Sequence, residues 1–162
     1  MWKKIDDKML KVYDIGMFWV IVMYEDYTKQ SLPSKYYREL LGSALCVFNS
    51  NNGFIIENIL RLDDEQALSW YVLADKTSGQ LNGLICEKCG DEVKQNFEEL
   101  VTMRNRIVHS FRITNAAGQQ VLATKEKESD GNRQFEITEQ YLLDFIAKNE
   151  RLSDMLHALR GC

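Results

Sequence analysis

Basic and polar side chains gather in one short stretch of the sequence, "TMRNRIVHSFRI" (Thr102 to Ile113). A histidine can transfer a proton at neutral pH, either from a ribose 2′-hydroxyl or to a leaving oxygen. An arginine can bind a phosphate through two hydrogen bonds and stabilise charge that develops on its oxygens. An amide beside the histidine can orient the imidazole ring or bind the phosphate itself. This set suits cleavage of RNA without a metal ion, and the candidate residues are Arg104, Asn105, Arg106, His109 and Arg112.

Helical geometry decides which of these side chains lie together. The apolar spacing from Asp91 to Phe111 predicts a helix, on which Asn105 and His109, four residues apart, share a face. Arg104 and His109 are five residues apart, which offsets them by about 140° around the helix axis. A long arginine side chain, a helix that ends near His109, or a second subunit is needed to bring both groups to one phosphate.

A purely structural explanation of the same residues is also open. Acidic residues gather in the first half of the predicted helix and arginines in its second half. This arrangement complements the helix dipole without any catalytic role. From residue spacing alone this explanation is favoured, because short motifs often match by chance.

The hexapeptide "RNRIVH" (Arg104 to His109) resembles the R-x4-H motif of the HEPN superfamily in its R-N-x-x-x-H form. The resemblance extends to the place of the motif, at the end of a late helix, and to the "HSF" that begins at the histidine. It implies a HEPN helical bundle with metal-independent endoribonuclease activity on RNA and no cofactor. By this resemblance Arg104 and His109 are the catalytic pair and Asn105 supports them.

The same resemblance implies partners and a biological role. Members often form homodimers in which two motifs face a shared cleft. Many prokaryotic members act as toxins or in antiviral defence, paired with an antitoxin protein. In part of the family the motif continues to R-x4-H-x-Y, and the partner silences the toxin by modifying that tyrosine. The corresponding residue here is Phe111, which has no hydroxyl to modify, so an antitoxin of that type is less expected.

Two further predictions concern the surroundings of the motif. Arg106 and Arg112 are expected to contact the RNA backbone. The alternative to a ribonuclease is a HEPN-like module that binds nucleotide, RNA or a protein without catalysis. Binding without turnover would distinguish this module from the enzyme.

Length and charge bound the kind of protein that carries the motif. The 162 residues predict one domain, residues 1–162. A net charge of −4 argues against a surface coated with basic residues for non-specific duplex binding, but it permits a local anion site. The most apolar run, "IGMFWVIVMY" (residues 15–24), is about half of the roughly 20 residues that a membrane-spanning helix needs. No secretory signal is visible, and we expect a cytoplasmic protein without a membrane segment.

The predicted fold class is all-α, a four- to five-helix bundle of HEPN type. A first helix is predicted from near Lys4 to near Lys29, with the apolar run in its core. A second helix is capped by Ser34 and ends in "NSNNG" (residues 49–53). Residues 54–76 are one helix or two that break near Asp63, and "TSGQLNG" after them is a loop or a weak turn.

The C-terminal half adds the predicted motif helix, a hairpin and a last helix. Asp91 is expected to cap the motif helix. Strand-like residues on both sides of "KESDGN" predict a small β-hairpin, an insertion at about 118–138, because Asp-Gly favours a tight turn. The last amphipathic helix follows Thr138.

Cysteine spacing gives weak evidence for a metal site. Cys86 and Cys89 form a single "CEKC" pair without a second pair or two nearby histidines. A structural zinc site normally has four ligands at recognisable spacing. We therefore predict two incidental thiols and no metal site.

Overall fold

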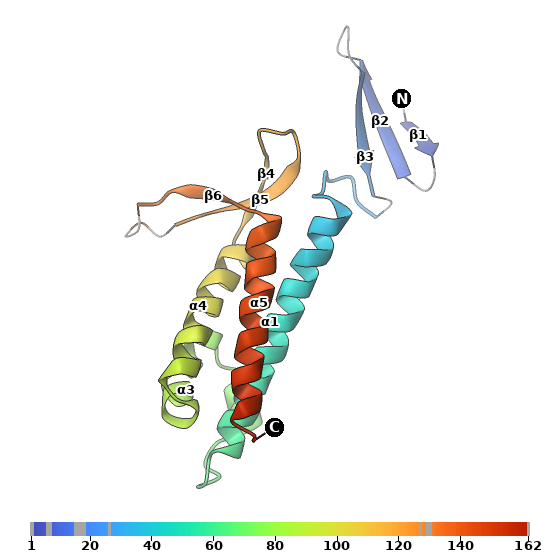
Figure 1. Cartoon of the computed structure of the whole chain (residues 1–162). Helices are drawn as coiled ribbons and strands as arrows, with labels where there is room; N and C mark the ends of the chain where they lie inside the picture. The colour runs from blue at the N-terminus through green and yellow to red at the C-terminus, as the bar shows by residue number, and fades with distance from the viewer. Residues whose placement is uncertain are drawn as a thin grey trace.

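The computed structural model describes residues 2–5, 8–14, 19–25, 27–126, 128 and 131–161. Within these ranges the chain is mostly helical, with five α-helices and two three-stranded antiparallel sheets. Figure 1 shows α1 and α5 side by side at the centre, with α4 beside them and β4–β6 at one end of the helices. None of the described helices is both long and apolar enough to cross a membrane.

The N-terminal segment corrects the sequence prediction. The expected helix from near Lys4 to near Lys29 is wrong, because its described part forms strands β1 (Trp2–Ile5), β2 (Lys8–Asp14) and β3 (Trp19–Tyr24). These strands pair in the order β1-β2-β3. Residues 15–18 of the apolar run lie outside the described residues. The physical reason is that β-branched residues such as those of "VIV" in β3 favour strands, and periodicity alone does not separate a short apolar strand from a helix.

Helix α1 (Lys35–Arg61) is the longest element and begins where the sequence predicted. The Ser34 hydroxyl accepts a hydrogen bond from the Tyr37 backbone N–H at 3.0 Å, which satisfies a donor that the first turn leaves unpaired. The predicted end in "NSNNG" is wrong, since α1 continues through it. Asn51, within this stretch, is buried and its amide donates to the Asn149 carbonyl on α5 at 2.6 Å. This tertiary bond outweighs the low helix propensity of asparagine.

A turn and a series of short helices follow α1. The chain breaks near Asp63, one of the two predicted possibilities, and continues with α2 (Trp70–Ala74). The predicted loop "TSGQLNG" is instead a 3₁₀ helix (Ser78–Leu81) that leads directly into α3 (Asn82–Cys89). Its start is a capping box, in which the Thr77 and Gln80 side chains each bond the other residue's backbone N–H.

The motif helix is α4 (Asp91–Val108), and it packs against both α3 and α5. Its cap residue is Gly90, with φ of 95°, and Asp91 lies in the first turn rather than at the cap. Three stacked phenylalanines join α1, α4 and α5. The Phe48 ring lies 5.9 Å from that of Phe97 and 6.0 Å from that of Phe145, and all three are fully buried.

The predicted hairpin is present and carries one more strand. Strand β4 (Phe111–Thr114) pairs with β5 (Gln120–Lys125), which pairs with β6 (Gln134–Ile137). Asp130 of the predicted turn lies outside the described residues. Helix α5 (Glu139–Ala158) then begins with the Thr138 side chain as its cap, as expected. The sheet therefore connects the C-terminal end of α4 to the start of α5.

Candidate functional site

The motif occupies the last two turns of α4 and its cap. The backbone N–H of His109 donates to the Asn105 carbonyl at 3.0 Å, and the Ser110 hydroxyl donates to the Ile107 carbonyl at 2.6 Å. These bonds satisfy carbonyls that a helix end leaves unpaired. Because the helix stops at Val108, the His109 side chain stands at its tip and is exposed to solvent.

The arginine of the motif is held by two contacts on the surface of the bundle. The Arg104 guanidinium lies over the ring of Phe48, with 5.4 Å from its central carbon to the ring centroid. Its Nη1 donates to Asn105 Oδ1 at 2.8 Å. A cation–π contact of this kind is worth about 0.5–1 kcal/mol at an exposed site. The two contacts orient Arg104 and leave the amide nitrogen of Asn105 as a free donor among the described residues.

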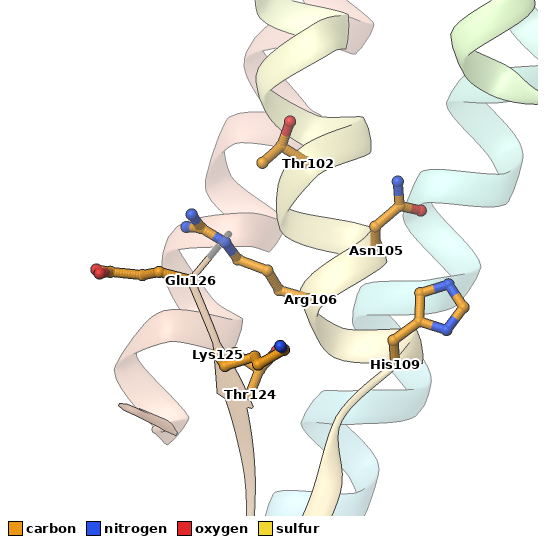
Figure 2. Close-up of a pocket in the computed structure, with 7 residues that line it drawn as sticks. All are labelled: Thr102, Asn105, Arg106, His109, Thr124, Lys125 and Glu126. Atoms are coloured by element: carbon orange, nitrogen blue, oxygen red, sulfur yellow. The ribbon is translucent and has the colours of Figure 1, made fainter. Parts of the chain in front are cut away.

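Two hollows flank Asn105. The first, of about 310 Å³, lies between α4 and β5 and is lined by Thr102, Asn105, Arg106, His109, Thr124, Lys125 and Glu126. The second, of about 430 Å³, is lined by Asn52, Lys76, Thr77, Ser78, Gly79, Val101, Arg104 and Asn105. Asn105 and His109 line the first hollow, whereas Arg104 lines the second together with Asn105. Figure 2 shows Asn105 and His109 projecting to the same side of α4.

The two predicted backbone contacts have different surroundings. Arg106 lines the first hollow, and its guanidinium lies 5.5 Å from the centroid of the Phe135 ring on β6. The Tyr141 hydroxyl is nearby, and burial raises its pKa above the ordinary value, a rise that Arg106 offsets only in part. Arg112 lines neither hollow, and its Nη1 donates to the Ser31 carbonyl at 2.7 Å. Arg106 thus lines the same hollow as His109, whereas Arg112 lies outside it and binds the Ser31 carbonyl.

Sequence reasoning missed the residues that other elements bring to the motif. Lys125 and Thr124 come from β5, and Lys76 comes from the turn before the 3₁₀ helix. Their approach depends on tertiary packing, and nothing in the local sequence marks them as neighbours of α4. The sequence does contain a capping-box pattern, with Thr77 followed three residues later by Gln80. This pattern indicates the 3₁₀ helix that begins just after Lys76.

The cysteine pair lies on α3, away from both hollows. Cys89 is buried, which raises the pKa of its thiol, and Cys86 donates to Asp91 Oδ1 at 3.0 Å, which also raises its pKa. Both pKa values lie above the ordinary value, so the two thiols of the metal-free chain are protonated at neutral pH. Among the described residues no group of three or more histidine, cysteine, aspartate or glutamate side chains is arranged to hold a metal ion.

Comparisons with protein-family models, with curated proteins and with solved structures found no match to this chain.

Proposed function

We propose that this protein is a metal-independent endoribonuclease of the HEPN type, with Arg104, Asn105 and His109 at its site. One observation carries the proposal. The "RNRIVH" motif lies at the C-terminal end of α4, at the surface. His109 lines one hollow there and Arg104 lines a second, and Asn105 lines both. A purely structural helix end needs no such hollows beside it.

The reaction assigned to these groups is an internal transfer of the phosphate. His109 takes the proton of a ribose 2′-hydroxyl, and the 2′-oxygen attacks the adjacent phosphorus as the bond to the 5′-oxygen breaks. The products are a 2′,3′-cyclic phosphate and a 5′-hydroxyl, whose proton comes from solvent or from a histidine that carries one. Arg104 stabilises the negative charge on the phosphate oxygens, and Asn105 donates to the same oxygens from its free amide nitrogen.

The placement of the catalytic pair favours a homodimer. Within one chain Arg104 and His109 line two different hollows, and the two linings share only Asn105. A two-fold axis near Asn105 would place Arg104 of one protomer beside His109 of its partner. The proposed dimer therefore has two composite sites. In each site, one subunit supplies Arg104 and the other supplies His109.

A second candidate function is binding of RNA without cleavage. It is favoured by the contacts that already engage Arg104, with Asn105 and with the Phe48 ring. Phe111, 45% exposed at the position where part of the family has a tyrosine, excludes silencing by modification at that residue. A toxin or antiviral role predicts growth arrest when the protein is overproduced, and the binding module predicts none.

The test is cleavage of single-stranded RNA in the presence of EDTA, with analysis of the product ends. The expected result is cleavage that leaves 2′,3′-cyclic phosphates. His109→Ala should lower kcat/KM by about 10²–10⁴-fold, and Arg104→Ala by about 10²–10³-fold. His157→Ala is the matched control, since it removes the other histidine of the chain from an exposed position on α5. Full activity in either motif variant would contradict the assigned roles.

A further inference from the structure

The hollow between α4 and β5 concentrates positive charge in an acidic protein. The chain carries a net charge of −4, yet this hollow holds both Arg106 and Lys125. Its one carboxylate, Glu126, lies 3.6 Å from Arg133, which offsets its charge. A polyanion is repelled by the protein as a whole, so it binds where basic groups converge.

The two cations are presented in complementary ways. Arg106 is held over the Phe135 ring, and Figure 2 shows it extending from α4 toward β5. Lys125 is exposed on β5 and forms no ion pair with any described residue. The Phe135 ring therefore holds the Arg106 guanidinium at the hollow, and the exposed Lys125 ammonium can approach the same anion on its long side chain.

The remaining lining residues limit what else the hollow offers. The Thr102 hydroxyl already donates to the Glu98 carbonyl at 3.0 Å, so it shapes the wall instead of donating to a ligand. Asn105 gives its oxygen to Arg104 and keeps its amide N–H groups as donors. The hollow therefore offers the N–H groups of Arg106, Lys125 and Asn105, which suit an anionic ligand.

We propose that this hollow is a binding subsite for a backbone phosphate of single-stranded RNA, held between Arg106 and Lys125 next to His109. The β4–β6 sheet thus supplies part of the substrate path through Lys125. The proposal rests on the proposed function, because it describes the strand that the same site cleaves. A volume of about 310 Å³ admits one nucleotide-sized segment, whereas a duplex presents its phosphates on a wide, stiff surface.

The experiment measures binding without cleavage. A fluorescent single-stranded RNA oligonucleotide, 2′-O-methylated so that it has no attacking hydroxyl, is titrated with protein at several salt concentrations. Lys125→Gln should weaken binding roughly three- to tenfold and reduce the salt dependence by about 0.7 in the slope of log K against log salt. Lys125 is exposed, and circular dichroism verifies that the variant folds as the wild type does.

A matched variant removes the same charge elsewhere. Lys35→Gln alters the exposed start of α1, outside the hollow. It should leave the slope unchanged. Equal Kd values and slopes for Lys125→Gln and Lys35→Gln would overturn the subsite, and so would an oligonucleotide that fails to bind the wild type.

Further experiments distinguish an RNA phosphate from a small free phosphate, and they test the subsite separately from the ribonuclease activity. Inorganic phosphate or a mononucleotide that competes as well as the oligonucleotide would overturn an RNA subsite in favour of a small-anion site. Wild-type protein that binds through Lys125 but cleaves no unmodified RNA supports the subsite and refutes the ribonuclease. Cleavage with binding that is independent of Lys125 supports the ribonuclease and refutes the subsite.

Discussion

A single buried hydroxyl ties the sheet that carries Lys125 to the helical bundle. Tyr37, on the first turn of α1, donates from its hydroxyl to the Ile137 carbonyl at the end of β6, at 2.6 Å. Tyr37 is 3% exposed and Ile137 is 0% exposed. We predict that Tyr37→Phe, which removes only this oxygen, destabilises the fold and loosens the sheet at the candidate site.

The magnitude follows from what the substitution leaves behind. The Ile137 carbonyl stays buried and loses the hydrogen bond from the Tyr37 hydroxyl, and leaving a buried polar group without its bond costs about 1–3 kcal/mol. For a protein of this size each kcal/mol lowers Tm by roughly 2–4 °C, so a central loss of about 2 kcal/mol corresponds to about 4–8 °C. The Phe ring still fills the space of the Tyr ring, so no cavity adds to the loss.

The assay is urea unfolding, followed by circular dichroism, of the wild type and two variants. Tyr36→Phe is the control, since its side chain is next in sequence but 52% exposed. We expect Tyr36→Phe to stay within about 0.5 kcal/mol of the wild type, as surface substitutions usually do. A Tyr37→Phe variant as stable as Tyr36→Phe would refute the reasoning that this bond anchors the sheet.

Two further predictions test the core and its ionisation. Phe48→Ala should lower the free energy of unfolding by about 3–5 kcal/mol, because it empties the centre of the phenylalanine stack and removes the ring under Arg104. Val72→Ala, at a residue that is 57% exposed, is the control. Thermal unfolding of both variants checks this, and a loss below that of Val72→Ala would contradict it. Burial raises the pKa of the Cys89 thiol above its ordinary value of 9.0. The protonated thiol therefore contributes fully to stability below pH 9, and this contribution is lost as the pH rises through the folded-state pKa. The free energy of unfolding between pH 7 and 10.5 should fall less steeply for Cys89→Ala than for the wild type or the exposed Cys46→Ala, and parallel curves would refute this reasoning.

The elements that the sequence predicted are those with strong local signals. The Ser34 and Thr138 caps located the starts of α1 and α5, and the alternating residues around Asp-Gly located β5 and β6. Capping and alternation act between residues close in sequence, so they are visible without a structure. The helical face shared by Asn105 and His109 was predictable for the same reason.

The elements that were missed depend on contacts between distant segments. Helix α1 continues through "NSNNG" because Asn51 bonds to Asn149, which is 98 residues away. The strands near the N-terminus were mistaken for a helix because their apolar run is too short for its period to decide. The pairing of β5 between β4 and β6 is what brings Lys125 to the hollow that His109 lines. No spacing in the sequence indicates this proximity.

The most direct test of the composite ribonuclease site is to mix two inactive variants. Arg104→Ala and His109→Ala are purified separately, mixed, and allowed to exchange subunits before RNA cleavage is measured in EDTA. If Arg104 of one protomer works with His109 of its partner, each mixed dimer has one intact site and one doubly altered site. Random exchange should then restore about a quarter of wild-type activity, because about half of the dimers are mixed. If the mixture stays as inactive as its components while the wild type cleaves RNA, the composite site is contradicted.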